Sequence, residues 1–585
     1  METRLDKGQF WDRFKNRAVM VADLPPGHSR DLAERVNHTE GRGDDSLRTR
    51  AEFSALFDLV LRELAAEPAA PSLPLVDGAG RVTAAGQAVD DYTRASKGKD
   101  EFFDQAMYLV EVTGWPEEHL QPEEPVEAPD GARLAMWPTD PRDARHIPAP
   151  GEDGVLFATT TFSLMNSGNR TLRVPKRSWK VEFESRAGDD RLVGMSRLNL
   201  KAMWNDPSQM REALAWRLLD AVGIPASRHT YAKLAINGRY RGLFSLIEQV
   251  DGRFLKDHFG KNDKGNLYKA YCGDLGCATL EHRVGDGGDD SGRQYRSPAG
   301  SDDATYRLKT NEDDPAANTY DDLAALIRTI NGIGLPGGDG RFDTDGFRAA
   351  VERIMNARAF LRWAGANLLL GSWDNYFATP SNYYLYNSGY RGNEDGFVAS
   401  PYFTFIPWDY DNSLGLDYFD TAWQYTDIVD WPSNTRNYHR WASTSRIPLV
   451  QNLLQNRELL RYYLDHLEHL LDTWFNPDAV AADIGADGGG GLWDRVSQAA
   501  YLESDTPHGP AFTGRQYSND EVYRSGCLQH ELRHGDTKAE GICHYVRMRY
   551  DSARSQLAGL RATHPAGASG ATFSGMMEAL PGAAP

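Results

Sequence analysis

The sequence predicts an α+β fold in which a β-rich half precedes a helical half. Alternating or continuous apolar runs rich in β-branched and aromatic residues recur between residues 155 and 250. From residue 320 onward, longer segments carry apolar residues three and four positions apart. With 585 residues, of which 41% are hydrophobic and 11% aromatic, the chain can bury a large core and does not have the composition of a disordered protein.

Five strands and one helix are predicted in the first half. The strands are expected, in chain order, at residues 155–164, 178–184, 197–203, 230–236 and 240–248. Asn237-Gly238 separates the last two, and this dipeptide is a strong signal for a two-residue hairpin turn. Between the third and fourth strands, Asp206 and Pro207 are typical first residues of a helix, which we expect over 207–222.

The second half is predicted to be mainly helical. Apolar residues at helical spacing indicate helices at residues 320–330, 347–370 and 449–475. An acidic, glycine-rich loop precedes them within residues 285–318. The last residues, from about 563, are mostly Ala, Gly, Ser and Pro and predict a disordered tail.

Charge and hydropathy exclude some classes of function. The chain has 64 Lys and Arg against 83 Asp and Glu, and its net charge of −19 would repel a nucleic-acid backbone. No apolar run reaches the roughly 18 to 20 residues of a transmembrane helix, so we expect none. The N-terminus lacks the pattern of a signal peptide, which predicts either a chain outside that export route or one whose signal has been removed.

Two segments between predicted helices carry the residues best suited to chemistry. Asp374 and Asn382 flank the approach to an aromatic, β-type run, and Asp409 and Asp411 follow another apolar run. On a regular strand these two aspartates would face the same side about 7 Å apart, an arrangement that a divalent cation such as Mg²⁺ would stabilise. The alternative is a turn in which the acids accept hydrogen bonds from backbone amides.

The chain resembles the CotH family of spore-coat and surface proteins, which have an atypical protein-kinase fold. The resemblance rests on blocks in one order: P-K-R-S-W-K at 175–180, L-N-L-K-A at 198–202, N-D-P-S-Q-M-R at 205–211, N-G-R-Y-R-G-L-F-S-L-I-E-Q-V-D at 237–251, G-N-L-Y-K at 265–269, W-D-N at 373–375, N-Y-Y-L-Y at 382–386 and P-W-D-Y-D at 407–411. It covers about residues 155 to 475. It implies a two-lobed kinase-like fold with these boundaries: an N-terminal extension of unknown role (1–150), a β-rich small lobe (151–270), a mainly α-helical large lobe (271–560) and a tail (561–585).

The resemblance also implies an ATP site with Mg²⁺, or Mn²⁺ in its place. Asp374 would be the aspartate of the catalytic loop, and Asn382 and Asp409 would hold the metal. Asp411 is a further metal-ligand candidate. The chain has no G-x-G-x-x-G, H-R-D or D-F-G motif, so this assignment depends on the family resemblance and not on a general kinase signature.

Contacts with the nucleotide are less sharply defined by the resemblance. Lys180 and Lys201 are both candidates for the lysine that binds the phosphates, and the sequence does not choose between them. Glu212 is the candidate partner of that lysine on the following helix. Glu248, at the end of the last predicted strand of the small lobe, is a candidate contact for adenine.

Three functions follow from these residues. The first is an ATP-dependent protein kinase that phosphorylates Ser or Thr of a protein, such as a coat or surface protein, or of itself. The second is a structural coat or surface protein that keeps the fold without catalysis; by resemblance the chain would be at the cell surface or spore coat, and the alternative is the cytoplasm.

The third is a zinc hydrolase, because residues 530–534 read H-E-L-R-H and fit H-E-x-x-H if they are helical. A structural zinc site formed by Cys527, His530, His534 and Cys543, a Cys527–Cys543 disulfide and a plain surface helix are the alternatives for this segment. Cys272 and Cys277 make up the four cysteines, which do not decide the compartment.

Overall fold

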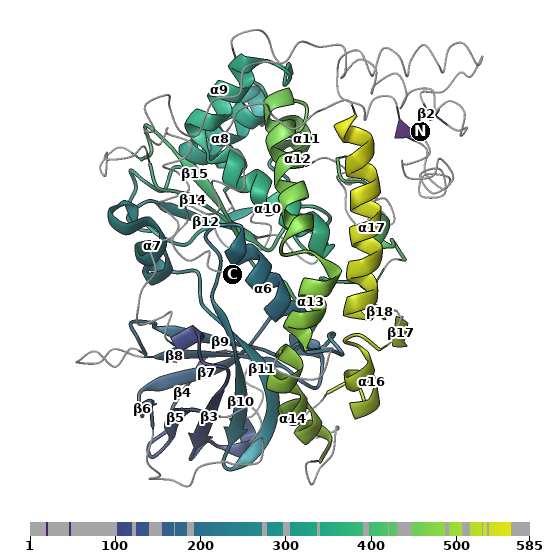
Figure 1. Ribbon diagram of the computed structural model, residues 1–585. Coiled ribbons are helices and arrows are strands. Elements are labelled where there is room, and N and C mark those ends of the chain that lie inside the picture. Colours follow the sequence, from purple (N-terminus) through teal and green to yellow (C-terminus); the bar gives the residue numbers. More distant parts are fainter. Residues whose placement is uncertain are drawn as a thin grey trace, which may run out of the picture.

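The structure of the chain is a computed structural model. It describes residues 19–20, 46–47, 102–119, 124–139, 155–168, 170–183, 192–271, 278–296, 305–335, 340–389, 397–418, 420–429, 447–485, 491–505, 515–528, 531–534 and 537–562. The α+β class is confirmed: the structure contains two larger β-sheets and a group of helices (Figure 1). The helical pattern before residue 100, Cys272, Cys277, His530 and the predicted tail from residue 563 lie outside the described residues.

The larger sheet has nine strands, in the order β4-β7-β8-β9-β11-β10-β3-β5-β6. In chain order they are β3 (Tyr108–Thr113), β4 (Val126–Glu127), β5 (Arg133–Pro138), β6 (Phe157–Thr159), β7 (Phe162–Ser167), β8 (Ser178–Phe183), β9 (Arg197–Lys201), β10 (His229–Ile236) and β11 (Arg239–Ile247). Only β3 and β10 pair in parallel; the other neighbours are antiparallel. Four of the five predicted strands are present as β8 to β11, but the single strand expected at 155–164 is wrong: it is divided into β6 and β7, which lie near opposite edges of the sheet. The hairpin turn is confirmed because Asn237 and Gly238 both have positive φ.

Part of the segment before residue 150 belongs to this sheet. β3, β4 and β5 are hydrogen-bonded into it, although the sequence assigns them to an N-terminal extension. Their apolar residues join those of the later strands in one buried layer; Val110, Leu134, Val181 and Leu200 are all fully buried there. The short strands β1 (Val19–Met20) and β2 (Ser46–Leu47) pair with each other in a separate ribbon.

The helix after β9 begins later than predicted. It is α6, Arg211–Ala221, and Asp206 is not its N-cap. Instead, Asp206 accepts hydrogen bonds from the backbone amides of Ser208 (2.8 Å) and Arg211 (2.9 Å), which folds the Asp-Pro-Ser segment into a turn before the helix. The buried guanidinium of Arg211 also donates to the carbonyl groups of Leu414 and Glu540, so α6 is tied to two distant segments of the chain.

A second sheet of four strands lies above the nine-stranded sheet in Figure 1. Its order is β13-β12-β14-β15, and all its pairs are antiparallel. The strands are β12 (Asn266–Ala270), β13 (Tyr306–Leu308), β14 (Tyr383–Asn387) and β15 (Phe403–Pro407). Helix α7 (Gly252–Phe259) connects β11 to β12, and its first turn is capped by the side chain of Asp251.

The helices predicted in the second half are present, but two are interrupted. They are α8 (Asp321–Ile330), α9 (Asp345–Ile354), α10 (Ala357–Leu370), α11 (Pro448–Leu453) and α12 (Arg457–Asp472). The single helices expected at 347–370 and 449–475 are therefore wrong: Asn356 and Asn456 cap the start of α10 and α12, because their side chains accept backbone amide hydrogen bonds. α10 is buried along its whole length and forms the centre of the main core.

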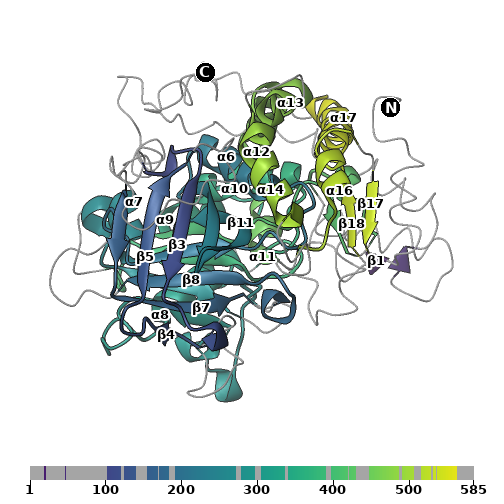
Figure 2. The same ribbon diagram turned by 90° about the horizontal axis from the view of Figure 1, so that it is seen from below.

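The C-terminal segment packs along one side of this arrangement. Its helices are α13 (Pro477–Ile484), α14 (Leu492–Asp505), α16 (Asn519–Arg524) and α17 (Ile542–Arg561). Seen from below, they gather with α12 beside the nine-stranded sheet (Figure 2). In the part of the chain with described coordinates, no helix combines the length and the apolarity needed to span a bilayer.

The structure contradicts the zinc-binding interpretations of the H-E-x-x-H segment. Glu531–His534 form strand β17, which pairs with β18 (Thr537–Glu540), and β18 pairs with β16 (Leu416–Asp417). On a strand, residues four apart do not take the helical arrangement that a zinc protease uses. Cys527 and Cys543 form a disulfide, the alternative that leaves no thiolate for zinc.

Candidate active site

Asn382 and Asp409 meet because they lie at the same end of two paired strands. β14 and β15 are antiparallel with Tyr383 opposite Pro407, so the residue before β14 and the residues after β15 are neighbours. The backbone amide of Trp408 donates to the carbonyl oxygen of Asn382 at 3.1 Å. Both Asn382 and Asp409 have positive φ, 52° and 62°, a costly conformation that the paired strands impose at this end of the sheet.

Asp374 lies on the loop that follows α10. Gly371 ends this helix with φ of 58°, and a Cβ atom at this position would come within 2.1 Å of the hydroxyl oxygen of Tyr545. Only glycine therefore fits the tight turn that leads to Asp374.

One buried side-chain amide on α10 is hydrogen-bonded to both segments that carry the aspartates. Asn367, which is fully buried, accepts hydrogen bonds at Oδ1 from the side-chain amide of Asn375 (2.9 Å) and from the hydroxyl of Tyr410 (3.0 Å). The indole of Trp363 donates to the Tyr410 hydroxyl oxygen at 2.6 Å. Since Asn375 adjoins Asp374 and Tyr410 lies between Asp409 and Asp411, this network sets the relative positions of the aspartates.

The carboxylate of Asp374 is held at both oxygens. The hydroxyl of Thr379 donates to Oδ1 at 2.7 Å, and the side-chain amide of Asn412 donates to Oδ2 at 3.0 Å. The amide of Asn382 donates to the backbone carbonyl of Asp374 at 2.9 Å. Asn205, in the segment after β9, donates to the side-chain oxygen of Asn412 at 2.6 Å. Through Asn412, this segment is linked to the carboxylate of Asp374.

Lys201 joins the acidic residues from the nine-stranded sheet. Its Nζ atom lies 2.6 Å from Oδ1 of Asp409 and 5.5 Å from the ring centroid of Trp408. Burial would lower the pKa of Lys201, but the negative charges of Asp409, Glu212 and Asp411 outweigh it and raise the pKa above its ordinary value. Lys201 is therefore a cation that the surrounding carboxylates hold in its charged form.

Glu212, on the first turn of α6, is buried beside this ion pair. Its carboxylate oxygens make no hydrogen bond of normal geometry with the described residues, although the side chains of Trp216 and Ser245 approach them. Burial raises the pKa of Glu212, and the charge of Lys201 opposes the rise. A buried carboxylate that lacks hydrogen bonds next to a lysine is suited to serve as a second partner for that lysine.

Asp411 adds a further carboxylate to the cluster. Burial raises its pKa well above the usual value, and the neighbouring carboxylates of Asp409 and Glu212 raise it further. Such crowding of acids favours the binding of a cation, and oxygen ligands of this kind suit Mg²⁺. Within the described ranges, however, no three His, Cys, Asp or Glu side chains are grouped closely enough to hold a metal on their own. The residues fit a magnesium ion that takes one or two carboxylates and completes its shell with water and substrate phosphates.

The other predicted contacts lie outside this cluster. Lys180 is ion-paired with Glu182 at 2.8 Å, and Glu182 also pairs with Arg197 at 3.0 Å. Of the two lysines that the sequence left open, the structure thus places only Lys201 against Asp409. Glu248 is buried and ion-paired with Arg228 at 2.9 Å, so its carboxylate is engaged within the protein.

Sequence reasoning did not single out the residues that hold Asp374. Asn412 directly follows Asp411 in the printed sequence, and this adjacency is a signal that could have drawn attention to it. Asn205 belongs to the family block at 205–211, but its link to Asp374 through Asn412 depends on a contact made only in the folded chain, as does the hydrogen bond of Thr379.

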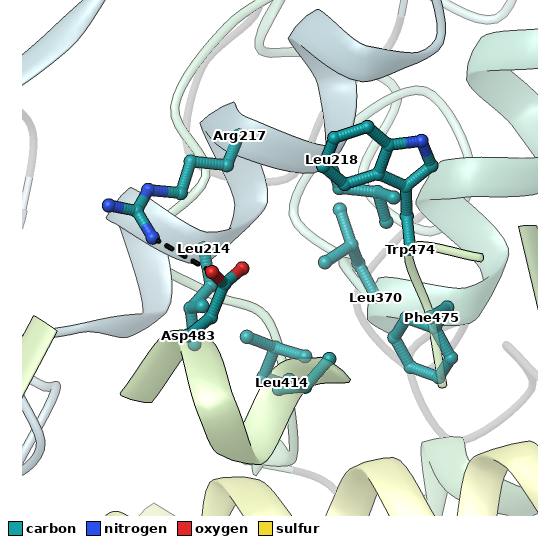
Figure 3. A pocket seen from close by; sticks show the side chains of 9 residues that line it. Leu214, Arg217, Leu218, Leu370, Leu414, Trp474, Phe475 and Asp483 are labelled. Atoms are coloured by element: carbon teal, nitrogen blue, oxygen red, sulfur yellow. Dashed lines mark ion pairs between the residues drawn. The ribbon is translucent and has the colours of Figure 1, made fainter. Parts of the chain in front are cut away.

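A separate apolar pocket lies against α6 (Figure 3). It is lined by Leu214, Arg217, Leu218, Leu370, Leu414, Trp474, Phe475, Val480 and Asp483. Arg217 and Asp483 form an ion pair of 3.4 Å at its edge. None of the predicted site residues lines this pocket, so it does not belong to the acidic cluster.

Comparison with known proteins places the chain in a family. The sequence profile of the family described as CotH kinase protein matches residues 165–486. Invasin CotH2 of Rhizopus delemar is 23% identical over 327 residues, which cover 55% of this chain and 47% of the invasin. Inner spore coat protein H of Bacillus subtilis is 23% identical over 285 residues, covering 47% of this chain and 67% of that protein. Invasin CotH3 of Rhizopus delemar is 21% identical over 350 residues, covering 57% of this chain and 50% of the invasin. The match thus spans about half the length of the two invasins. With more than half of its length matched by the profile, the chain belongs to the CotH kinase protein family.

Proposed function

We propose that this chain is an ATP- and Mg²⁺-dependent protein kinase that transfers the γ-phosphoryl group to Ser or Thr. The observation that carries the proposal is the connected cluster at the meeting point of the two sheets. A lysine, a carboxylate that can orient a hydroxyl and oxygen ligands for a metal are the parts that phosphoryl transfer requires, because its catalysis depends mainly on positioning and charge neutralisation. Lys201, Asp374, Asn382 and Asp409 provide these parts within one network.

Each residue has a defined role in the proposal. Asp374, oriented by its two hydrogen-bond donors, would accept a hydrogen bond from the acceptor hydroxyl and take up its proton as the new phosphate ester forms. Asp409 and Asn382 would hold Mg²⁺, which neutralises charge on the β- and γ-phosphates when bound. Lys201 would bind the phosphates.

The ion pair between Lys201 and Asp409 implies an exchange of partners on ligand binding. Asp409 cannot serve both Lys201 and a metal ion with the same oxygen at 2.6 Å. With nucleotide bound, Lys201 would turn to the phosphates, and the buried carboxylate of Glu212 would balance its charge. The burial of Glu212 beside Lys201 supports this role as the partner of the lysine on α6.

A phosphotransfer assay tests the proposal. Purified protein is incubated with γ-labelled ATP, Mg²⁺ and Ser/Thr-containing acceptor peptides, and label in the peptides and in the protein itself is measured. Asp409→Asn should reduce incorporation by about a hundredfold or more, because a metal ligand is lost while the side-chain shape is kept. Asp420→Asn is the matched control, since Asp420 is 69% exposed and paired with Arg533 on β17. Equal incorporation by the wild type and Asp409→Asn, or none by the wild type, would refute the proposal.

The alternative is a coat or surface protein that keeps this fold without catalysis. The Lys201–Asp409 ion pair favours it in one respect, because it satisfies both groups without any ligand. A non-catalytic chain should show no increase in melting temperature with Mg²⁺ and ATP, whereas a ligand that binds the native state raises it. The names of the relatives, spore coat protein and invasin, support a coat or surface protein as the acceptor and the same location for this chain.

A further inference from the structure

A second lysine, Lys269 on β12, faces the same cluster from the four-stranded sheet. It lies opposite Tyr384 on β14, and its Nζ atom is 5.8 Å from the centroid of that tyrosine ring. Among the described residues, no carboxylate or carbonyl group lies within ion-pair or hydrogen-bond distance of its ammonium group. Its side chain is only partly exposed, and a cation in such a place usually has an anionic partner.

The aromatic rings that the two lysines contact also contact each other. Lys201 lies over Trp408 and Lys269 lies over Tyr384, and these two rings contact each other at a centroid distance of 6.0 Å in an edge-to-face arrangement. Lys201 belongs to the nine-stranded sheet and the other three residues belong to the four-stranded sheet or its end. Two lysines from different sheets thus lie against two aromatic rings that contact each other, and their charges interact.

The charges around Lys269 are mostly positive. Burial lowers its pKa, and the nearby charge of Lys201 lowers it further; Asp409 acts in the opposite direction. Arg307, directly opposite Lys269 on β13, adds another positive charge. On the side of the acidic cluster that Lys269 faces, two cations therefore act on this lysine against the one carboxylate of Asp409, and a bound anion would relieve their repulsion.

We infer that Lys269 is a second phosphate-binding residue and that it grips, together with Lys201, the polyphosphate chain of a nucleotide placed between the two sheets. This inference rests on the proposed function for the identity of the ligand, but its geometry is independent of catalysis. A polyphosphate chain is long enough and carries enough oxygen atoms to accept hydrogen bonds from two ammonium groups at once. A single carboxylate would satisfy only one of them. The ligand would thus join the two sheets, and Lys269 would contribute to affinity from the side opposite Lys201.

Binding measurements on single variants test this inference. Titration calorimetry is performed on the full chain with ATP and, separately, with inorganic tripolyphosphate, which carries no base. Lys269→Met should weaken both ligands by about tenfold to a hundredfold, as expected for the loss of one charge-assisted hydrogen bond. Lys269→Arg keeps the charge and should retain most of the affinity. Lys264→Met is the matched control, because Lys264 precedes β12 and its side chain is 79% exposed; its affinities should equal those of the wild type.

The outcomes separate this inference from the kinase proposal. Wild-type affinities in Lys269→Met for both ligands, or no binding of tripolyphosphate to the wild type, would overturn the inference even if the phosphotransfer assay is positive. A loss confined to ATP would also overturn it, since it would place Lys269 against the base or ribose. Binding of both ligands that depends on Lys269, without any phosphotransfer, would refute the kinase and leave the phosphate site standing. Unchanged circular dichroism of Lys269→Met shows that a lower affinity is not caused by unfolding.

Discussion

Replacing Asn367 with leucine should increase the local opening of both the segment that carries Asp374 and the segment that carries Asp409. The substitution removes the acceptor for the Tyr410 hydroxyl and for the Asn375 amide. Asn375 keeps its hydrogen bonds to Ser372, so the main loss is the buried hydroxyl hydrogen of Tyr410, which has no other acceptor among the hydrogen bonds of the described residues. An unsatisfied buried donor costs about 1 to 3 kcal/mol. Local opening of the Asp374 and Asp409 segments should then become roughly fivefold to a hundred-and-fiftyfold more frequent.

Native-state hydrogen exchange followed by mass spectrometry measures this local effect without requiring the large chain to unfold in one step. Peptides covering residues 371–382 and 403–417 should exchange faster in Asn367→Leu, while peptides from β10 should not change. Tyr410→Phe alone leaves the indole N–H of Trp363 without its acceptor. The double variant Asn367→Leu with Tyr410→Phe carries this cost but not that of the orphaned hydroxyl, so its effect on exchange should be smaller than the sum of the two single effects. Unchanged exchange in the single variant, or a double variant whose effects simply add, would refute the reasoning about this network.

Two other substitutions probe the cluster itself. Burial raises the pKa of Glu212 from 4.5 to about 7 in the folded protein, so the folded state binds more protons than the unfolded state between these values and loses stability as pH rises through them. Glu212→Gln should therefore stabilise the protein by about 3 kcal/mol above pH 7 and hardly at all near pH 4.5. The measurement is the melting temperature of the variant and of the wild type at the two pH values. A difference of the same size at both pH values would contradict this prediction. Asn412→Ala removes one of the two donors that orient Asp374, so kcat should fall by about tenfold while the KM for ATP stays unchanged. Steady-state kinetics that show a raised KM and a normal kcat would contradict this role of Asn412.

Local pattern was sufficient to predict much of the first sheet. Strands β8 to β11 and the turn at Asn237 follow from alternation and turn chemistry, which are properties of neighbouring residues. The four-stranded sheet was not predictable as a sheet. β12 pairs with β14 more than a hundred residues later, and the three-residue strand β13 has too few positions to show a period.

The site likewise combines residues that the sequence identified with contacts between distant segments that it could not show. Asp374, Asn382 and Asp409 were identified by resemblance, and the structure brings them together in one place. The choice between Lys180 and Lys201 could not be made from the sequence, because the two lysines lie on adjacent strands and are distinguished by the carboxylates that pair with them in the folded chain. Lys180 pairs with Glu182, which is two residues later in the chain. Lys201 pairs with Asp409, which is 208 residues later.

The engagement of Glu248 also depends on folding. Its partner Arg228 directly precedes β10 and Glu248 directly follows β11, and the register that pairs His229 with Ile247 brings the two side chains together. Sequence spacing alone therefore could not show that this carboxylate is satisfied within the protein.

The most direct test of the central claim compares ATP labelled at the γ-phosphate with ATP labelled at the α-phosphate. We expect that the wild type incorporates the γ-label into Ser or Thr in a Mg²⁺-dependent manner, that the α-label is not incorporated, and that Asp374→Asn abolishes the incorporation. Incorporation of the α-label, or γ-incorporation that persists in Asp374→Asn, would contradict the assignment of this cluster as a γ-phosphoryl transfer site.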